Sequence, residues 1–563
     1  MLDTEQLVAE RLPQLHRYQW LQKPVTKVLS KLLHEQDIES FGERYPHLQG
    51  LEFVEHVLDF FQFRYQHCDH ELDNIPTQGR VIIIANHPIG SLDGLALLQL
   101  VSRVRSDVKI VANSWLQAVQ PLQSLFVAVD VLGSRAQRAQ VEAMQQWLAD
   151  DGALIIFPAG EVSRMTPVGV RDGQWRSGFV KLAQRTQAPV VPVHINAHNS
   201  LWFYGASMVY KPLATMMLVQ EMFRQQANQL SFTIGEAVAA KDLLGGDMPA
   251  MVRAKLMRRH LYRLGKGKSL IFPTQPAVAR PEARQALRQA VLACELLGQT
   301  GDGKQLRLYQ YQGNSPILRE LGRLREIAFR AVGEGTGKRR DLDNYDTYYY
   351  QLLVWDDNEL EIAGAYRFGD AQQIISRYGI SGLYTATLFE FRPALHGYLP
   401  QALELGRSFV QPRYWGRRSL DYLWQGIGAF VVRHPHYRYL FGAVTLSQAL
   451  PAPVKDAMVQ YYGTHYAPSQ PLARARHPYR PQTLAVPDNF EQLRSLASQH
   501  QVAVPPLYKH YAELCEAGGV SYSAFNVDAE FADAIDSFML VDLSRLTAKK
   551  RARYLLGKQQ LDT

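Results

Sequence analysis

The chain has 563 residues, 20% of them charged, and a formal net charge of +8 at neutral pH. This length allows more than one sizeable core, since a domain usually takes roughly 100 to 200 residues. The mildly basic balance suits an anionic membrane surface, an acidic carrier protein or small acidic molecules. We expect no nucleic acid partner, because no zinc-finger spacing or RNA-binding signature is present. We also expect no metal, because potential ligands are not clustered.

The cysteines and the apolar stretches predict the compartment. Cys68, Cys294 and Cys515 are far apart and odd in number, which predicts reduced thiols and no disulfide framework. The first 20 residues are charged throughout and lack the apolar core of a secretory signal. The longest stretches without a charged residue, 110–129 and 186–210, contain Asn, Gln, Pro or His and do not resemble a spanning helix. Any membrane contact should therefore be peripheral.

The N-terminal half alternates between helical and strand-like patterns. Residues 1–75 predict a helical packing segment, with apolar positions three and four apart in LEFVEHVLDFFQFRY. Short apolar runs follow, separated by helical patterns, at 81–85, 108–112, 126–131, 153–157 and 190–194. This alternation predicts an α/β domain over 76–275. Ligands of such sheets bind beyond the carboxyl ends of the strands.

The first chemical signal is RVIIIANHPIGSLDG at 80–94, which places His87 and Asp93 just after an apolar strand. The two side chains would not share a helical face at this spacing, so they must meet through the turn that Pro88 and Gly90 provide. A histidine held by a carboxylate is a ready base for a hydroxyl. The alternative is that Asp93 only caps the next helix and His87 is a satisfied strand-end histidine.

A second motif, FPAGEVSR at 157–164, also follows a strand. Its glycine, Gly160, permits close backbone approach, and Glu161, Ser163 and Arg164 are able to hold a polar acceptor. The alternative is an ordinary polar turn. Together the two motifs resemble the active site of the PlsC-like glycerolphosphate and lysophospholipid acyltransferase superfamily.

This resemblance covers roughly residues 76–240 and has two departures. The superfamily usually places His and Asp one residue closer, and Ala159 stands where it usually has Glu. These differences resemble the branch that contains hemolysin-like proteins and lyso-ornithine-lipid O-acyltransferases. The resemblance implies that His87 removes the proton of an acceptor hydroxyl, that Asp93 fixes its tautomer, and that the hydroxyl attacks an acyl thioester directly.

A Gly- and Pro-rich stretch at 265–283 predicts a domain boundary, with a linker over 276–304 and a second domain over 305–563. The second domain is rich in Tyr and Arg. We expect a mixed α+β fold, in which strands are followed by a long helix. The expected strands are at 306–312, 348–355, 362–368, 383–391 and 402–410, and the helix is at 419–434.

The loop between the last of these strands and the helix is basic and contains glycine. Backbone N–H groups at a helix N-terminus favour phosphate, and Arg413, Arg417 and Arg418 add positive charge. Together with Gly416, the loop resembles the pyrophosphate loop of the GNAT acyltransferases, which holds phosphopantetheine of coenzyme A or acyl carrier protein between strand and helix. Arg418 replaces the small residue that usually ends that motif.

Further matches resemble the ornithine N-acyltransferase family, itself similar to acyl-homoserine-lactone synthases. They lie at LREIAFR, DNYD, AYRF and ELGRSFV, at 324–330, 343–346, 365–368 and 404–410. This resemblance implies that Glu404 is the base for the attacking amine, that Asp343 and Asp346 bind cationic groups of the substrate, and that Arg407 binds its carboxylate. The alternative is that Glu404 and Arg407 form a structural ion pair.

The two resemblances together imply a bifunctional bacterial acyltransferase that makes ornithine lipid. The C-terminal domain would join a 3-hydroxyacyl chain from acyl carrier protein, or coenzyme A, to the α-amine of ornithine. The N-terminal domain would then acylate the free hydroxyl of the lyso-ornithine lipid. No bound cofactor is expected. Glycine, glutamine and lysine remain open as acceptors.

Two alternatives belong to other classes. One is a lysophospholipid acyltransferase with a degenerate GNAT-like module, and the other is a non-catalytic hemolysin-like membrane protein. The basic helical pattern at 251–268 predicts peripheral contact with anionic lipid at the cytoplasmic face of the inner membrane, or docking of an acidic carrier protein. A solvated helix face is the competing explanation for this pattern.

Overall fold

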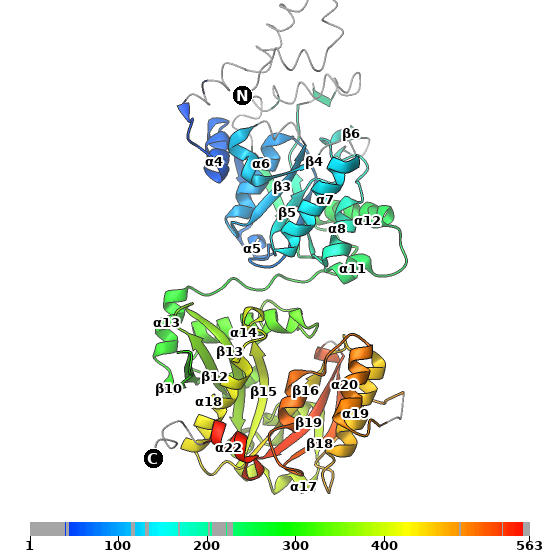
Figure 1. Ribbon diagram of the computed structural model, residues 1–563. Helices are drawn as coiled ribbons and strands as arrows, with labels where there is room; N and C mark the ends of the chain where they lie inside the picture. The colour runs from blue at the N-terminus through cyan, green and yellow to red at the C-terminus, as the bar shows by residue number, and fades with distance from the viewer. Residues whose placement is uncertain are drawn as a thin grey trace, which may run out of the picture. The chain divides into compact units, whose positions relative to one another are not determined.

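The computed structural model describes residues 40, 44–113, 119–129, 134–166, 169–200, 203–204, 221, 229–482, 486–531 and 533–555. Most of the expected N-terminal helical segment, up to residue 39, lies outside them. The chain divides into two compact units, Met1–Ala277 and Val278–Thr563. Each unit is built around its own large sheet (Figure 1).

The first unit contains a seven-stranded sheet in the order β1-β9-β8-β2-β5-β3-β4. All neighbours in it are parallel except β8 and β9. The strands are β1 (Arg64–Gln66), β2 (Val81–Ala85), β3 (Val108–Asn113), β4 (Phe126–Val129), β5 (Ala153–Ile156), β8 (Val190–Asn196) and β9 (Gln229–Ile234). The five apolar runs of the sequence thus form strands of one α/β sheet, as expected.

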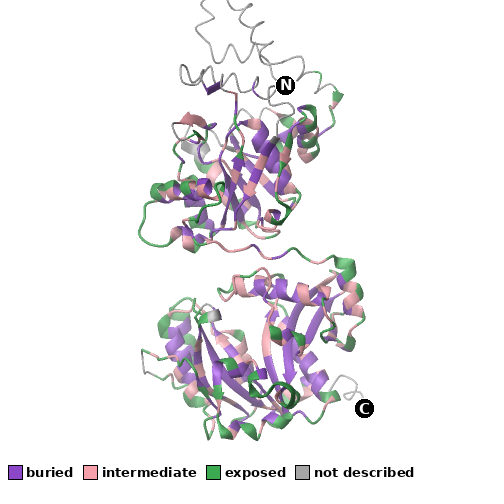
Figure 2. Ribbon diagram, turned by 180° about the vertical axis from the view of Figure 1, so that it is seen from behind, coloured by how far each residue is buried: buried purple, intermediate pink, exposed green. Residues whose placement is uncertain are grey.

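Helices cover both faces of this sheet. They are α4 (Gly50–Phe60), α5 (Asp69–Leu72), α6 (Ser91–Ser102), α7 (Ser134–Ala149), α8 (Gly178–Thr186), α11 (Ala240–Leu244) and α12 (Ala250–Leu264). Because side chains alternate along a strand, Ile83 of β2 packs with α4 and α6, whereas Ile82 and Ile84 pack with α7, α8 and α12. The strands between these two sets of helices are mostly buried, as the purple ribbon in Figure 2 shows.

The register of β2 and β5 positions the site of the first unit. The two strands are parallel neighbours, and Ile84 lies beside Ile156. Both strands therefore end at the same edge of the sheet, and the loops that follow them carry the His87 motif and the 157–164 motif. A short hairpin, β6 (Arg164–Thr166) with β7 (Gly169–Arg171), continues the second loop.

The second unit contains an eight-stranded sheet in the order β10-β11-β12-β13-β15-β16-β19-β18. All neighbours are antiparallel except β15 and β16. The strands are β10 (Glu295–Gln299), β11 (Gln305–Tyr309), β12 (Tyr350–Asp356), β13 (Glu361–Asp370), β15 (Ala402–Val410), β16 (Tyr439–Leu446), β18 (Val520–Asp528) and β19 (Ala534–Asp542). A separate pair joins β14 (Phe389–Phe391) to β17 (Ala473–Ala475).

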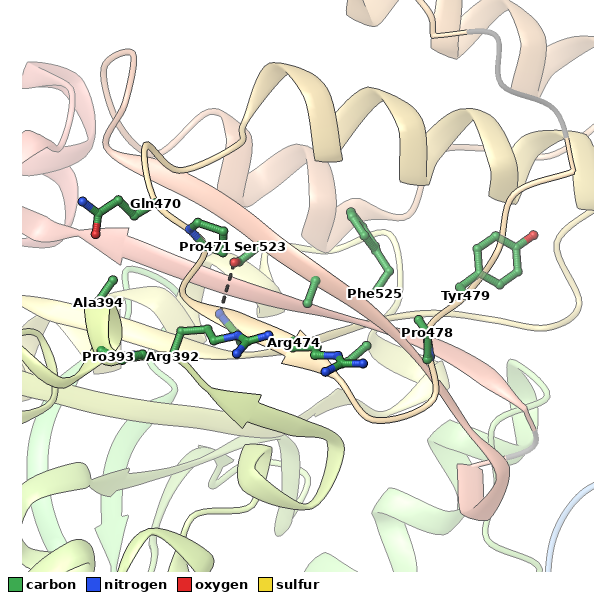
Figure 3. A pocket seen from close by; sticks show the side chains of 13 residues that line it. Arg392, Pro393, Ala394, Gln470, Pro471, Arg474, Pro478, Tyr479, Ser523 and Phe525 are labelled. Atoms are coloured by element: carbon green, nitrogen blue, oxygen red, sulfur yellow. Dashed lines mark hydrogen bonds between the residues drawn. The ribbon is translucent and has the colours of Figure 1, made fainter.

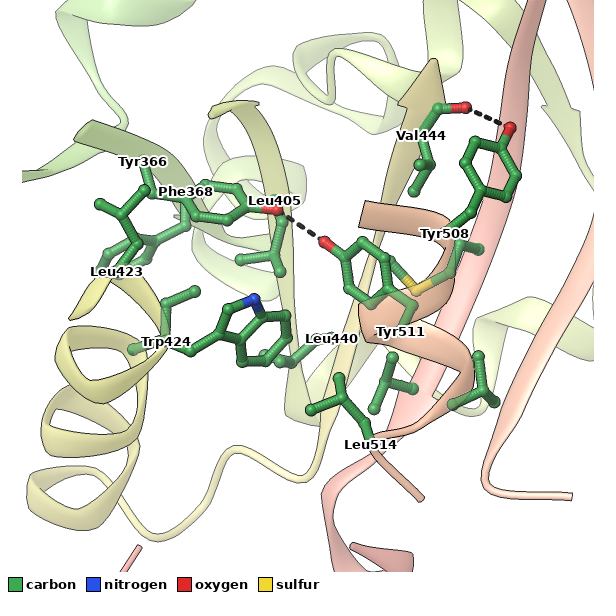
Figure 4. Close-up of a cluster of buried hydrophobic side chains, with 14 of the residues drawn as sticks. Tyr366, Phe368, Leu405, Leu423, Trp424, Leu440, Val444, Tyr508, Tyr511 and Leu514 are labelled. Atoms are coloured by element: carbon green, nitrogen blue, oxygen red, sulfur yellow. Dashed lines mark hydrogen bonds between the residues drawn. The ribbon is translucent and has the colours of Figure 1, made fainter. Parts of the chain in front are cut away.

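The helices of this unit pack on the sheet through an aromatic core. They are α13 (Arg284–Leu292), α14 (Pro316–Ala331), α15 (Ala371–Tyr378), α16 (Thr385–Leu388), α17 (Pro393–His396), α18 (Ser419–Arg433), α19 (Ala452–His465), α20 (Phe490–Gln499), α21 (Pro506–Ala512) and α22 (Ala548–Tyr554). Within the core, the hydroxyls of Tyr366 and Tyr511 lie 2.6 Å apart, and Tyr508 donates to the Val444 carbonyl (Figure 4). These bonds satisfy buried phenols that would otherwise cost free energy.

The parallel strands β15 and β16 separate part-way along their length. Their pairing covers Ala402–Leu405 and stops there. On its other side β15 has a β-bulge opposite β13, and Arg407 in the bulge has a φ of 49°. Such bulges re-aim side chains, and the gap after Leu405 is where the cavity of this unit opens.

Three expectations differ from the structure. β1, within the expected segment 1–75, pairs with β9 and so belongs to the first sheet. The expected linker 276–304 contains α13 and β10, because the apolar face of α13 is buried and β10 pairs with β11. The expected strand at 383–391 is a strand only at its end, in β14, because Thr385–Leu388 form the short helix α16. Glu404 accepts hydrogen bonds from the backbone at the start of that helix.

No helix in the described part of the chain combines the length and the apolar character needed to cross a membrane.

Candidate functional site

His87 and Asp93 meet at the end of β2. Nδ1 of His87 lies 2.8 Å from Oδ1 of Asp93, and the two side chains are 20% and 0% exposed. The atoms are at hydrogen-bonding distance but are not aligned for a straight hydrogen bond. The ring packs against Phe157, the first residue of the second motif, with ring centroids 4.2 Å apart. The partly exposed imidazole is thus held from behind by a buried carboxylate.

Asp93 also caps α6. Its Oδ2 accepts from the backbone N–H of Ile89, at 2.8 Å, and of Gly90, at 3.2 Å. Gly90 has a φ of 126°, which a side chain would make costly, and this makes the turn back towards His87 possible. The helix-cap alternative and the catalytic alternative are therefore compatible, because each uses a different oxygen of the same carboxylate.

Asp172 joins the two motifs, and sequence reasoning missed it. Its Oδ1 accepts from the backbone N–H of His87 and from the Ser163 hydroxyl, at 3.2 and 2.5 Å, and its Oδ2 accepts from Trp175 at 2.8 Å. The Ser163 N–H donates to the His87 carbonyl at 2.7 Å. Asp172 follows the 157–164 motif by only a few residues, in RDGQW, and that proximity was the available signal.

The second motif, at 157–164, contains both buried and exposed residues. Ser163 is buried and committed to Asp172 and His87, so it positions the loop, while Gly160 and Glu161 are exposed. Arg164 stands next to Ser163, and its guanidinium lies over the Phe203 ring. Two of its nitrogens, Nε and Nη1, are buried without a hydrogen-bond partner among the described residues. Such donors favour an anionic ligand.

The surroundings of His87 set its proton affinity. Burial favours the neutral ring, but the negative charge of Asp93 close to it, with a smaller contribution from Asp172, outweighs this effect and raises the pKa of His87. Burial also raises the pKa of Asp172. A histidine of raised pKa is a stronger base once it is neutral, so the arrangement suits removal of a hydroxyl proton.

In the second unit, a cavity of about 110 Å³ opens where β15 and β16 separate. Residues from four strands and the end of α14 line it, and its polar groups include Arg407, Ser408, Thr445 and two carboxylates, Glu334 and Asp536. Sequence reasoning missed both carboxylates, because they lie about 200 residues apart and no local motif links them.

Glu404 lies behind this cavity and does not line it. Its side chain is 1% exposed and accepts hydrogen bonds from the Tyr349 hydroxyl, from both Thr385 donors at 2.5 and 2.7 Å, and from the Tyr384 N–H at 3.1 Å. A carboxylate offers about four lone-pair positions, so these donors occupy the group. Its expected role as the base stays a prediction, while the geometry shows it holding Tyr384 and Thr385 in place.

Asp343, Asp346 and Arg407 belong to a buried ionic network. Asp346 lies 2.8 Å from Arg325 and 3.1 Å from Arg367, and Asp343 lies 2.5 Å from Arg367. Burial would raise the pKa of Asp346, but the two arginines outweigh it and lower that pKa. The two aspartates, expected to bind substrate cations, are thus paired with arginines of the chain.

Arg407 connects this network to the cavity. Its guanidinium lies 3.4 Å from Asp341 and 3.6 Å from Asp343, and it packs over the rings of Tyr384 and Phe531. No Glu404–Arg407 ion pair is present among the described residues, in contrast to the structural alternative weighed from the sequence. Of Asp343, Asp346 and Arg407, which the sequence predicts to bind the substrate, Arg407 is the one that lines the cavity.

The basic loop precedes α18 as expected. Gly416 has a φ of 73°, and Arg417 and Arg418 are exposed beside the first turn of the helix. Arg413 differs from them, because it pairs with Glu359 and Glu361, each at 2.8 Å. Two of the three expected arginines are therefore available to an anion. Among the described residues, no group of three or more potential ligands could hold a metal ion.

A larger groove of about 730 Å³ lies against the start of α17, β17 and the edge strand β18 (Figure 3). Its walls are mostly apolar, with Arg392 and Arg474 among the charged residues. None of the residues predicted from the sequence lines it. The smaller cavity, in contrast, is lined by Arg407 and by the carboxylates Glu334 and Asp536.

Two family models match the chain: one described as Acyltransferase at residues 6–266, and one described as Acetyltransferase (GNAT) domain at residues 324–425. A glycine N(alpha)-acyltransferase of Bacteroides thetaiotaomicron is 31% identical over 302 residues, which cover 49% of this chain and 89% of the relative. The chain belongs to the family of this acyltransferase. It is an enzyme with an α/β acyltransferase unit followed by a GNAT-type unit, and these two expectations are confirmed.

Other relatives of the chain carry related names. A lyso-glycine lipid O-acyltransferase of Bacteroides thetaiotaomicron is 28% identical, with 47% of this chain and 97% of the relative covered. An L-ornithine N(alpha)-acyltransferase of Brucella abortus is 27% identical, with 44% and 95% covered. Among solved structures, the 1-acyl-sn-glycerophosphate acyltransferase PlsC of Thermotoga maritima is 18% identical, with 48% and 95% covered and a TM-score of 0.26.

Proposed function

We propose that this acyltransferase is bifunctional and makes an aminolipid in two steps. The C-terminal unit transfers a 3-hydroxyacyl chain from acyl carrier protein, or from coenzyme A, to the α-amine of ornithine. The N-terminal unit then transfers a second acyl chain to the 3-hydroxyl of the lyso-ornithine lipid. The observation that carries the proposal is the presence of both family models on one chain, one of them over a paired His87 and Asp93.

In the N-terminal unit, the acceptor hydroxyl binds at the exposed side of His87. The neutral imidazole removes the hydroxyl proton as the oxygen attacks the thioester carbonyl, and Asp93 stabilises the imidazolium that forms. Arg164 has two buried donors without a partner among the described residues, and they suit the carboxylate of a lyso-aminolipid. Gly160 and Glu161 flank this position on an exposed turn.

In the C-terminal unit, the donor's phosphate binds the loop before α18, where Gly416, Arg417 and Arg418 are exposed. The acyl thioester reaches back along β15 to the cavity at the bulge. There Arg407 binds the carboxylate of the amino acid, and Asp343 and Asp346 hold the surrounding arginines in position. Asp343, Asp346 and Arg407 therefore belong to one ionic network, in which Arg407 contacts the substrate and the two aspartates position the arginines.

Glycine is the second candidate acceptor. It is favoured by the relatives named glycine N(alpha)-acyltransferase, which are 31% and 33% identical, against 27% for the Brucella abortus protein named for ornithine. The proposed two-step chemistry is the same for both acceptors, because each offers an α-amine and a carboxylate. The difference is confined to the side chain of the amino acid.

We place the enzyme at the cytoplasmic face of the bacterial inner membrane, in peripheral contact with lipid. The support is α12, on which Met251 and Val252 are 43% and 42% exposed beside the exposed Lys255 and Arg259. Apolar and basic side chains side by side suit an anionic lipid surface.

The test is expression of the whole chain in a bacterial host that makes no aminolipid, followed by mass spectrometry of the lipids. We expect a lipid with two acyl chains, one amide-linked and one ester-linked, on an ornithine headgroup. A glycine headgroup on the same scaffold would favour the second acceptor. Absence of any aminolipid, together with esterification of lysophosphatidic acid by the purified chain, would contradict the proposal.

A further inference from the structure

Two carboxylates that form no ion pair with another described residue line the cavity at the β15 bulge. Asp536 of β19 is 3% exposed and Glu334 follows the end of α14, and both line the cavity beside Arg407. Arg407 is already close to Asp341 and Asp343, so its charge is offset on the other side. The cavity therefore keeps an acidic wall, which favours a bound ammonium group.

Asp536 accepts fewer hydrogen bonds on its carboxylate than Glu404 does. Among the described residues, Thr445 is its one hydrogen-bond donor, at 2.7 Å to Oδ1, whereas Glu404 has four donors. A base needs an unoccupied lone pair that points to the proton it takes. Asp536 meets this condition inside the cavity, and Glu404 lies outside it.

We propose that Asp536 is the base that deprotonates the acceptor amine in the N-acyl transfer, and that Glu334 completes the acidic wall that receives this amine as an ammonium ion. The inference rests on the proposed N-acyltransferase function of the C-terminal unit.

Asp536 takes one proton from the bound ammonium, and the neutral amine attacks the thioester carbonyl, so that a C–N bond forms. The C–S bond then breaks, and the thiolate leaves with the electron pair. The second proton of the nitrogen passes to the thiolate, which gives the free thiol and the amide, and Asp536 returns its proton to solvent.

The surroundings of Asp536 and Glu334 raise the pKa of both carboxyl groups. Burial, and the charge of Asp528 on β18, raise the pKa of Asp536 to about 7, against the opposing effects of the Thr445 hydroxyl and Arg407. Burial, and then the charge of Asp536, raise the pKa of Glu334 to about 7. The remaining titratable groups near Asp536 are the phenols of Tyr384 and Tyr508.

The experiment measures thiol release by the full-length chain with ornithine and 3-hydroxypalmitoyl-coenzyme A between pH 5 and 9. We expect kcat/KM to rise with pH through about 7, because Asp536 acts only when ionised. Asp536→Asn should lower kcat by about 10² to 10⁴-fold, the usual contribution of a general base. Asp536→Glu should restore part of the rate.

Glu334→Gln distinguishes a catalytic role of Asp536 from a purely structural one, because a structural role would leave the pH profile of kcat/KM unchanged. It should shift the acid limb of kcat/KM to lower pH, because it removes a neighbouring carboxyl group whose charge interacts with that of Asp536. It should also raise the KM of ornithine, because the acidic wall loses one of its two carboxylates. Asn replaces Asp536 with the same shape, so a cooperative thermal transition that matches the wild type at pH 4, and lies at or above it at pH 8, confirms that the variant is folded.

Two results would overturn the assignment. One is an Asp536→Asn variant that keeps both its rate and its acid limb. The other is a Glu404→Gln variant that loses the acid limb while Asp536→Asn retains it, which would make Glu404 the base. If the wild-type chain acylates no amino acid with this donor, the proposed function fails together with the inference.

Discussion

The His87–Asp93 pair shows how one carboxylate serves two purposes. One oxygen of Asp93 closes the first turn of α6, and the other faces Nδ1 of His87. The turn that brings them together depends on Gly90 at positive φ. Loss of the Asp93 charge should therefore change the proton affinity of the ring before it changes the fold.

We predict the pH dependence of O-acylation on this basis. A pKa of His87 above its usual value means that kcat/KM for the lyso-aminolipid rises with pH through a limb above about 6.5, since only the neutral ring accepts a proton. Asp93→Asn should move this limb to lower pH and reduce the plateau by about 10² to 10⁴-fold. An unchanged limb, measured by ester formation at a series of pH values, would contradict the assignment.

Asp536 should also affect stability. Its folded pKa of about 7 is above the unfolded value, so the native state holds the proton more tightly, and stability falls as pH rises from about 4 to 7. Asp536→Asn removes this loss, which is on the order of 2 to 4 kcal/mol. The melting temperature of the variant should exceed that of the wild type by several degrees at pH 8. At pH 4 the two should be nearly equal, and the same difference at both pH values would contradict this explanation.

Residues that act together were predictable where the chain places them close in sequence. His87 and Asp93 lie within one turn, and their spacing in the sequence predicts that they meet. Asp172 joins the site through contacts that only the folded loop makes, and Asp536 reaches the cavity from a strand near the end of the chain. No spacing rule connects such residues.

At the scale of elements, strands with strong apolar runs were predictable and segments fixed by tertiary contacts were not. β2, β5 and β8 lie where the sequence places them. The segment 383–391 has a strand-like composition and ends in β14, but its first part forms the helical turn α16, where two backbone N–H groups donate to the buried Glu404. In the same way, α13 occupies part of a stretch whose Gly and Pro content predicted a linker.

The loop before α18 gives a prediction for donor binding. Arg417→Ala combined with Arg418→Ala should raise the KM of the acyl donor on the order of tenfold, because each contact of an exposed arginine with an anion contributes at most about 1 kcal/mol. The KM of the amino acid should not change. Arg413→Ala is the matched control, since Arg413 pairs with Glu359 and Glu361 and should affect melting more than donor KM. Equal changes in both KM values would contradict the loop assignment.

The exposed face of α12 gives a prediction for lipid binding. Lys255→Glu combined with Arg259→Glu should weaken co-sedimentation with vesicles that contain phosphatidylglycerol by about tenfold or more, since each basic residue contributes about 1 kcal/mol near an anionic surface. Vesicles of phosphatidylcholine alone should bind weakly in both cases. Arg494→Glu on α20, where the side chain is 67% exposed, is the matched control. An equal loss in that control would indicate a general charge effect.

For the whole molecule, the two activities that we propose for one chain would raise the concentration of the intermediate at the second site. We predict that His87→Ala and Asp536→Asn chains, expressed together, restore the two-chain lipid in trans, because each supplies the activity that the other lacks. The yield should be below that of the wild type at equal total protein. Failure to restore any two-chain lipid, with both variants folded, would indicate that the intermediate never leaves the chain.

The most direct test of two activities on one chain is the lipid profile of the His87→Ala variant in a host without aminolipids. The account predicts that the one-chain, amide-linked aminolipid accumulates, while the two-chain lipid falls by about 10² to 10⁴-fold. Loss of the one-chain lipid in this variant would contradict the account, because His87 would then be required for the first acylation.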